Sequence, residues 1–295
     1  MIVDYFPYFN ERELLELRIR LLQDHVDHFV IVEADQTFSG LPRTFQLNEL
    51  ITELGLPRDR FTVIEWHHAS NLDLQLEQHD FDSMYPEDRA DLISIQAVAR
   101  ERTQRNALLT VLDQFDPTDW IIMSDCDEII NPAHISFAVN VAGTVPNKVV
   151  KLPLINLYGR ADLRPYSLAG WPYTWRTAMS ICRADVIAQT TPHRIRCGYH
   201  LPMETVTPTL DGKIFDEFGW HFSWMGGEHK IRIKSESYAH APNQGHQQHR
   251  DRGFKFEENV CLTWNSDSIL RRFPQDQLPD LIFDLPHIQQ FLLPD

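Results

Sequence analysis

Basic residues are scarce in this chain of 295 residues. Lysine and arginine together number 27 against 42 aspartates and glutamates, which gives a formal net charge of −15. Nucleic acids and anionic lipid surfaces are bound through concentrated positive charge, so this balance argues against a nucleic-acid partner and against a polybasic membrane contact. An anionic substrate would need local help from a metal ion or from a few arginines.

Cysteine is also rare, and its placement excludes two common uses. The four cysteines Cys126, Cys182, Cys197 and Cys261 are widely scattered and form no C-x-x-C pair. Neither a zinc ribbon nor a dense disulfide framework fits such spacing. Reduced thiols in a cytoplasm fit best, so we expect a cytoplasmic location.

Targeting segments and phosphate-binding glycine loops are missing as well. The sequence begins Met-Ile-Val-Asp-Tyr-Phe, with no basic region before an apolar one, and no long apolar run follows. We therefore expect no signal peptide and no membrane span. No G-x-G-x-x-G, Walker or G-x-S-x-G pattern occurs, which argues against dehydrogenases, kinases and esterases.

Strand and helix signals alternate in the first part of the chain. Residues 3–8 are predicted to form a strand and 11–24 a helix with a wide apolar face. Continuous apolar runs at 29–33 and 61–65 are typical of strands buried on both faces, and a helix near 47–54 separates them. This order predicts an α/β fold with a mostly parallel central sheet flanked by helices.

Further along, a long helix is expected over 91–115, followed by strands from 120, over 148–158 and over 173–182. The sequence contains no internal repeat, low-complexity segment or convincing linker. We therefore expect a single domain over residues 1–295.

The most informative stretch is 120–129, Trp-Ile-Ile-Met-Ser-Asp-Cys-Asp-Glu-Ile, an apolar strand that ends in Asp125, Asp127 and Glu128. Ligands of open α/β sheets bind beyond the carboxyl ends of the strands. Two carboxylates there suit Mg²⁺ or Mn²⁺, which take one or two protein carboxylates and fill the remaining positions with phosphate oxygens and water. Alternatively, these acids cap the next helix, which Asn131 also suits. The triplet alone leaves both interpretations open.

Two other segments carry candidate site residues. Arg105 and Asn106 lie on the helix before the acidic strand, from which they could reach a diphosphate, although Arg105 could equally pair with Glu101 on a solvated helix face. The segment 219–230 concentrates tryptophan, histidine and glycine. Aromatic faces stack on sugar rings, and imidazole can ligate a metal ion, so this density favours a functional role.

Several blocks of the sequence together resemble glycosyltransferase family 17, which includes β-1,4-mannosyl-glycoprotein β-1,4-N-acetylglucosaminyltransferase. The matching blocks are 4–11, 13–18, 26–33, 37–40, 104–106, 124–129 and 219–224. The resemblance implies a GT-A type, Rossmann-like fold and an inverting transfer to a glycan acceptor. It also implies a UDP-sugar donor, with UDP-N-acetylglucosamine favoured, and dependence on Mn²⁺ or Mg²⁺. Residues 1–130 would form the nucleotide-sugar-binding half and residues 131–295 the acceptor-side half.

The resemblance also assigns roles to individual residues. The metal ligands would be Asp125, Asp127 and His221. Contacts to the nucleotide sugar would come from Glu33, Arg105, Asn106, Asp125, Trp224 and His240. Glu228, which follows a glycine pair, is the candidate general base, with Glu128, Glu204, Asp216 and Glu217 as alternatives. One departure from the family pattern is Ala241-Pro242 directly after His240, where the family tends to have an acid.

Two other functions remain as alternatives. A metal-dependent phosphoesterase could use the same acids and histidines. A non-catalytic carbohydrate-binding protein could instead present a platform of tryptophans, namely Trp171, Trp175, Trp220 and Trp224.

Overall fold

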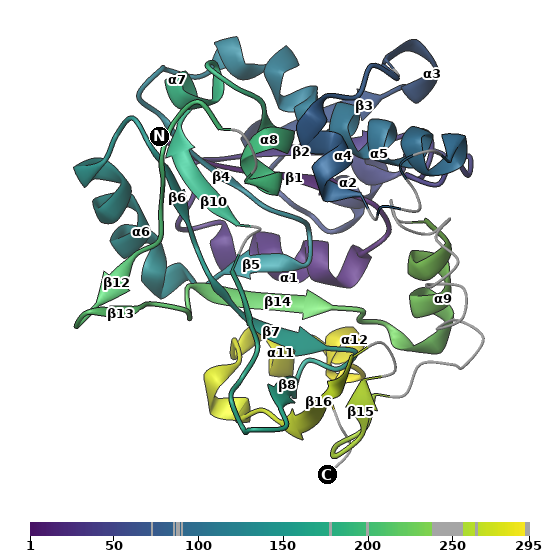
Figure 1. The fold of residues 1–295 in the computed structure, drawn as a ribbon, viewed down its shortest axis with the longest axis vertical. Helices are drawn as coiled ribbons and strands as arrows, with labels where there is room; N and C mark the ends of the chain where they lie inside the picture. Colours follow the sequence, from purple (N-terminus) through teal and green to yellow (C-terminus); the bar gives the residue numbers. More distant parts are fainter. Residues whose placement is uncertain are drawn as a thin grey trace.

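The structure is a computed structural model that describes residues 1–71, 73–84, 86, 89, 91–176, 179–198, 201–237, 256–262 and 265–292. Of residues 79, 83, 228, 261–262 and 265–267 it describes the backbone alone. The chain forms a large central sheet flanked by helices, with smaller sheets beside it (Figure 1). The helix bounds are α1 Arg12–Leu22, α2 Leu47–Glu53, α3 His68–Asn71, α4 Gln78–Ser83, α5 Leu92–Arg105, α6 Pro132–Thr144, α7 Ala184–Ile187, α8 Pro192–Cys197, α9 Gly227–Ser237, α11 Leu281–Asp284 and α12 Pro286–Gln289.

The central sheet has seven strands in the order β11-β6-β10-β4-β1-β2-β3. Their bounds are β1 Ile2–Tyr8, β2 His28–Ala34, β3 Phe61–Trp66, β4 Trp120–Met123, β6 Val149–Lys151, β10 Ser180–Arg183 and β11 Thr205–Val206. Strands β4, β1, β2 and β3 run parallel, as do β6 and β11, and β10 is antiparallel to both of its neighbours. The predicted α/β fold with a mostly parallel, helix-flanked sheet is confirmed. The sheet takes strands from both predicted halves of the chain, and the division at residue 130 stays a prediction.

Three smaller sheets complete the fold. One has the order β5-β14-β7-β9, another joins β15, β16 and β8, and a two-stranded hairpin pairs β12 with β13. Their bounds are β5 Glu128–Ile130, β7 Leu154–Tyr158, β8 Leu163–Ser167, β9 Thr174–Trp175, β12 Thr209–Leu210, β13 Lys213–Ile214, β14 Gly219–Ser223, β15 Cys261–Leu262 and β16 Asn265–Arg272. Single-turn 3₁₀ helices connect several elements: η1 Arg58–Arg60, η3 Asn106–Thr110, η4 Leu112–Gln114 and η5 Gln275–Gln277.

Helix α1 lies between the central sheet and the β5-β14-β7-β9 sheet (Figure 1). Leu15 and Ile19 pack into the core against the central sheet, whereas Leu14 and Leu17 pack into a second core with strands β7 and β14. Burial on two sides explains why the apolar face predicted for this helix is so wide. The helix thereby ties the two sheets together directly beneath the acidic turn after β4.

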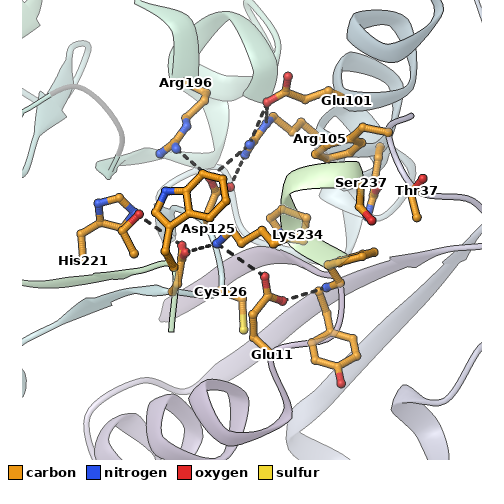
Figure 2. Close-up of a pocket in the computed structure, with 18 of the residues that line it drawn as sticks. Glu11, Thr37, Glu101, Arg105, Asp125, Cys126, Arg196, His221, Lys234 and Ser237 are labelled. Atoms are coloured by element: carbon orange, nitrogen blue, oxygen red, sulfur yellow. Dashed lines mark hydrogen bonds and ion pairs between the residues drawn. The ribbon is translucent and has the colours of Figure 1, made fainter. Parts of the chain in front are cut away.

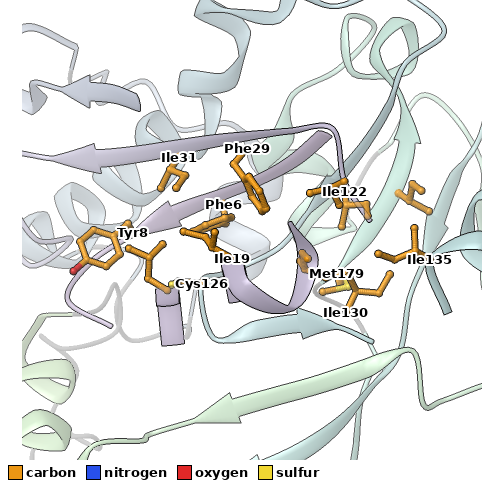
Figure 3. Packing of buried hydrophobic residues seen from close by; sticks show 14 of the residues in the cluster. Phe6, Tyr8, Ile19, Phe29, Ile31, Ile122, Cys126, Ile130, Ile135 and Met179 are labelled. Carbon is orange, nitrogen blue, oxygen red and sulfur yellow. The ribbon is translucent and has the colours of Figure 1, made fainter. Parts of the chain in front are cut away.

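Strand β1 places its side chains alternately in two cores. Phe6 and Tyr8 face the cluster that contains α1, as Figure 3 shows, whereas Val3 and Tyr5 face the opposite cluster, which includes Ala107 and Leu108 of η3. Both faces of the strand are therefore covered, and the same is true of β2 and β4. This burial is the physical reason that these strands are continuous apolar runs in the sequence.

The helix predicted over 91–115 is shorter than expected. Helix α5 ends at Arg105, and 3₁₀ helices follow. The buried hydroxyl of Tyr5, on β1, shares its proton between the carbonyl oxygens of Gln104 (3.2 Å) and Arg105 (2.8 Å). The last carbonyls of the helix therefore bond to a side chain from the sheet. The side chain of Asn106, at the C-cap, accepts from the backbone N–H of His193 at 3.0 Å. Contacts with distant residues thus end this helix.

The two strand segments predicted over 148–158 and 173–182 are each divided between two sheets. The first forms β6 and β7, with Pro153 between them, and the second forms β9 and β10. Proline has no N–H to donate to a ladder, which favours a break at that point. Among the described residues, no helix combines the length and the apolar character needed to cross a bilayer.

Candidate active site

A cavity of about 330 Å³ lies at the carboxyl ends of β1, β2 and β4. Arg196 of α8, Lys234 of α9 and His221 of β14 also line it, as the close-up in Figure 2 shows. Its charged lining residues are Glu11, Glu101, Asp125, Asp127, Arg43, Arg105, Arg196 and Lys234. The cavity is therefore lined by four acidic and four basic side chains. In a chain of net charge −15, the basic side chains of this cavity balance its acidic ones.

The turn that carries the acidic residues is held from below by Arg18. This arginine, fully buried on α1, donates twice to the carboxylate of Asp4 (2.7 and 2.6 Å). Its other bonds, each 2.7 Å long, go to the backbone carbonyls of Asp125 and Glu128 and to the hydroxyl of Ser124. All five N–H groups of the guanidinium are thus engaged. The backbone of the turn is fixed before any ligand arrives.

Asp125 lies between two arginines from different helices. Its carboxylate accepts from both terminal nitrogens of Arg105 on α5 and, at 2.6 Å, from Arg196 on α8. Arg105 also pairs with Glu101 at 3.0 Å, so the pairing expected on the helix face and the contact with the site both exist. Burial raises the pKa of Asp125, but the two guanidiniums outweigh it and hold that pKa well below its usual range. Asp125 is therefore a carboxylate that orients two arginines toward the cavity.

Glu128 is fully buried and joins the turn to two more elements. Its carboxylate accepts from Trp175 Nε1 at 2.6 Å and from Arg196 at 2.7 and 2.8 Å, while Asp125 donates its backbone N–H at 2.9 Å. Arg196 therefore donates to two acids of the same turn, Asp125 and Glu128, and these bonds restrict rotation of its guanidinium.

The carboxylate of Asp127 lies between a lysine and a histidine. Its Oδ2 accepts from Lys234 Nζ on α9 at 2.6 Å, and its Oδ1 lies 3.8 Å from His221 Nε2 on β14. Burial raises the pKa of Asp127, but Lys234 and His221 lower it below the ordinary value. Although burial lowers the pKa of Lys234, Asp127 and Glu11 raise it above the ordinary value, so both partners are charged at neutral pH.

The surroundings of His221 select one form of its ring. Nδ1 lies 3.0 Å from the side-chain oxygen of Asn156, which accepts the Nδ1 proton, and Trp175 stacks on the ring at a centroid distance of 4.6 Å. Burial lowers the pKa of His221, against the opposing charges of Asp127 and Glu128. With Nδ1 bonded to Asn156, Nε2 is the ring nitrogen that faces Asp127. A carboxylate oxygen and an imidazole nitrogen so placed are donors that divalent cations accept.

The helix-capping interpretation of the acidic triplet fails. Helix α6 begins at Pro132, and its cap is Asn131, whose side-chain oxygen accepts from the N–H of Ala133 at 3.0 Å. Asp125 and Asp127 instead line the cavity.

Two other predicted site residues lie outside the cavity lining, and the structure does not describe the side chains of two more. Glu33 accepts from the backbone N–H groups of Gln46 and Leu47 at the start of α2, and neither it nor Asn106 lines the cavity. Glu228 belongs to α9, but its side chain lies outside the described part of the structure, as does the whole of His240. Their roles stay predictions.

The tryptophans of the predicted stacking platform are separated. Trp175 and Trp224 line the cavity, Trp171 is 75% exposed, and Trp220 is buried with its Nε1 donating to the carbonyl of Gln277. Trp224 adopts a positive φ of 61°, which costs a bulky residue about 1–3 kcal/mol and typically persists at ligand sites. Its Nε1 donates a hydrogen bond to the hydroxyl oxygen of Tyr158 at 3.1 Å.

Two basic residues at the centre of the site were not assigned from the sequence. Arg196 belongs to the six-residue helix α8, which starts at Pro192 and ends at Gly198 in the left-handed conformation. Those boundary residues are a readable helix signal, but nothing in the pattern brings Arg196 to Asp125. Lys234 lies on α9, and nothing in the sequence pattern brings it to Asp127. Both contacts arise only when distant segments fold together.

Comparison with known proteins identifies the chain. The sequence pattern of glycosyltransferase family 17 matches residues 1–159. The chain belongs to glycosyltransferase family 17. The match contains β4, Arg105 and the acidic turn, while the part of the family 17 chain that supplies Arg196, His221 and Lys234 lies beyond it. No curated protein matches the sequence significantly.

Solved structures resemble the family 17 chain only distantly. A 4-diphosphocytidyl-2C-methyl-D-erythritol synthase shares 12% identity, with 73% of this chain and 91% of that chain covered and a TM-score of 0.39. A mannose-6-phosphate isomerase from Helicobacter pylori shares 12%, with 69% and 84% covered and a TM-score of 0.35. Residues 1–349 of S. aureus TarS share 14%, with 63% and 48% covered and a TM-score of 0.33. Likenesses this distant say nothing about activity.

Proposed function

We propose that this glycosyltransferase moves a sugar, N-acetylglucosamine in the favoured case, from a UDP-sugar to a hydroxyl of a glycan acceptor, with inversion at the anomeric carbon. The observation that carries the proposal is the convergence of Asp125 and Asp127 with Arg105, Arg196 and Lys234 in one cavity at the carboxyl edge of the sheet. The three cysteines whose side chains are described are free thiols, which supports a cytoplasmic location.

The arginines supply the phosphate contacts in this proposal. Arg105 and Arg196 each carry a planar guanidinium suited to phosphate oxygens, and the carboxylates that accept their hydrogen bonds in this structure hold them in place. Because they are already oriented, little side-chain entropy is lost on binding. Negative charge that develops on the departing UDP would meet donors that need not reorganise.

A divalent cation, Mn²⁺ or Mg²⁺, fits the remaining part of the cavity. Asp127 Oδ1 and His221 Nε2 face each other at 3.8 Å, too far apart for a direct hydrogen bond. The described residues contain no group of three or more acidic, histidine or cysteine side chains placed to hold a metal ion, so the diphosphate would have to complete the coordination. When bound, the ion would neutralise charge on the diphosphate. Asp125, already paired with two arginines, would contribute mainly by orienting them.

The acceptor hydroxyl must lose its proton as its oxygen bonds to the anomeric carbon and the bond to UDP breaks. A carboxylate positioned on the acceptor side would take that proton, and we propose Glu228 of α9 for this role. General bases contribute about 10²–10⁴-fold, so Glu228→Gln should reduce kcat by at least 10²-fold. An unchanged kcat would assign the base to another carboxylate.

Calorimetric titration of UDP and of UDP-N-acetylglucosamine, in Mn²⁺ and then in EDTA, tests the donor site. We expect binding that Mn²⁺ strengthens and that Asp127→Asn and His221→Ala each weaken, while Asp276→Asn, remote from the cavity, has no effect. Circular dichroism and thermal melting check that each variant is folded. Failure to bind any of a panel of nucleotide sugars would reject the proposal and favour a carbohydrate-binding protein. Release of sugar phosphate without transfer would favour a phosphoesterase.

A further inference from the structure

Lys234 is hydrogen-bonded to the carboxylate of Asp127, which the metal ion would need as a ligand. Its Nζ lies 2.6 Å from Asp127 Oδ2, and Glu11 Oε1 is 4.0 Å from the same nitrogen. The lysine side chain is 28% exposed and that of Asp127 only 5%, so the contact is mostly shielded from water. Figure 2 shows Lys234 reaching from α9 into the centre of the cavity, between the acidic turn and Glu11.

The positive charge of Lys234 opposes a divalent ion at Asp127. Two cations that share one carboxylate lie within a few ångströms of each other, and their repulsion is strong where water is excluded. His221 Nε2 lies 3.8 Å from Asp127 Oδ1, and an imidazole brings no negative charge to offset the ammonium. In the absence of nucleotide, Lys234 therefore keeps the affinity of this site for a divalent ion low.

A bound diphosphate changes that balance. The ammonium of lysine is a point charge on a flexible four-carbon stem, so it can turn from one oxygen to another without moving the backbone. Glu11, on the far side of Nζ from Asp127, is one alternative partner, and the oxygens of a diphosphate would be a second. With its charge satisfied by phosphate, Lys234 would release Asp127 to the metal ion.

We propose that Lys234 is a positioning residue that competes with the divalent ion for Asp127 and thereby makes metal binding depend on the nucleotide. This inference rests on the proposed function, because it takes the donor diphosphate as the group that draws Lys234 away. The coupling is reciprocal, so Mn²⁺ must strengthen UDP binding by the same factor as UDP strengthens Mn²⁺ binding. Such coupling between two ligands is typically about 5–150-fold.

The test is Mn²⁺ binding, followed by the electron paramagnetic resonance signal of free Mn²⁺, with and without UDP. We expect the wild-type protein to bind Mn²⁺ weakly alone and at least about fivefold more tightly with UDP. Lys234→Met should bind Mn²⁺ at least about fivefold more tightly than wild type without UDP, and UDP should add little. Lys234→Arg keeps the positive charge and should retain the weak binding.

Lys230→Met is the matched control. Lys230 lies one turn earlier on α9 and pairs with Glu13, away from Asp127. The Lys230→Met variant should bind Mn²⁺ with the same affinity as the wild-type protein. Thermal melting of every variant checks folding, and Lys234→Gln replaces Lys234→Met if the apolar side chain prevents folding.

The outcomes separate this inference from the proposed function. If wild type binds Mn²⁺ with UDP and transfers sugar, yet Lys234→Met and Lys234→Gln bind free Mn²⁺ no more tightly than wild type, the competition is rejected and the transferase stands. If no variant binds Mn²⁺ even with UDP, the competition and the metal requirement are both rejected, and UDP binding in EDTA decides whether the nucleotide site remains.

Discussion

Arg18 donates a 2.7 Å hydrogen bond to the backbone carbonyl oxygen of Asp125, although 107 residues separate them. The same guanidinium pairs with Asp4 on β1, so a single buried side chain fixes the acidic turn to the first strand of the sheet. A buried charge of this kind is costly unless every donor is matched, and here every donor is. The turn therefore presents its carboxylates in one defined orientation.

Replacing Arg18 with lysine should destabilise the protein. An ammonium has three N–H donors where the guanidinium has five, so buried acceptors lose their partners at a cost of about 1–3 kcal/mol each. We expect urea denaturation to show a lower free energy of unfolding by at least that amount. Arg20→Lys, a change on the same helix at a residue 36% exposed, should be nearly neutral. Equal losses in the two variants would contradict the role given to Arg18.

Arg196→Lys should weaken UDP binding. Lysine keeps the charge but loses the planar fork held between Asp125 and Glu128. A hydrogen bond to a charged group contributes about 1.5–3 kcal/mol, so the loss should be on the order of 10–100-fold in Kd. Arg194→Lys is the control, since Arg194 lies on the same helix and pairs with Glu77 away from the cavity. If calorimetry shows that both variants bind UDP equally weakly, Arg196 does not contact the diphosphate.

Trp175→Phe should cost stability through one specific bond. Phenylalanine retains an aromatic ring to stack on His221 but cannot donate to the buried carboxylate of Glu128. Because that acceptor is charged, the free energy of unfolding should fall by about 1.5–3 kcal/mol. Trp171→Phe, at a side chain 75% exposed, should change it by about 0.5 kcal/mol or less. Chemical denaturation of the two variants in parallel measures the difference.

His193 should make stability depend on alkaline pH. Burial lowers the pKa of His193, but Asp80 at 3.1 Å and Cys197 raise it, to about 9 overall. With the folded pKa above the unfolded value of about 6.5, the contribution is complete below pH 6.5 and disappears as pH rises to about 9. The total is on the order of 3 kcal/mol.

The measurement is urea unfolding of wild type and His193→Gln between pH 6 and 10. The wild-type stability should decline across the window more steeply than that of the variant. Parallel profiles would show that His193 is neutral in the folded protein.

The sheet and the acidic turn were the parts of this protein most open to prediction. Val3, Val30 and Ile121 belong to runs that are apolar throughout, because these strands are covered on both faces. The position of Asp125 and Asp127 directly after such a run places them at the carboxyl edge of the sheet, since parallel strands end on the same side. Arg105, on the helix predicted directly before the acidic strand, was a reasonable candidate for the same edge, and it lies there.

Local pattern was a poor guide wherever a distant residue decides the outcome. The end of α5 depends on the hydroxyl of Tyr5, about 100 residues earlier in the chain, and so the helix was predicted too long. Glu33, which the resemblance places at the donor, accepts from the N–H groups at the start of α2, and its contact with the donor stays a prediction. Both contacts connect segments whose separation in sequence gives no hint of their proximity.

The sequence by itself determined the class of fold, the edge of the sheet at which ligands would bind and the two carboxylates at that edge, because hydrophobic periodicity and the abrupt end of a buried strand are local properties. Only the tertiary structure decided which cations meet those carboxylates. Arg196 and Lys234 come from short helices more than 70 residues beyond Asp125 and 100 beyond Asp127. A buried carboxylate needs a cation close to it in the folded protein, and that cation can come from any part of the chain.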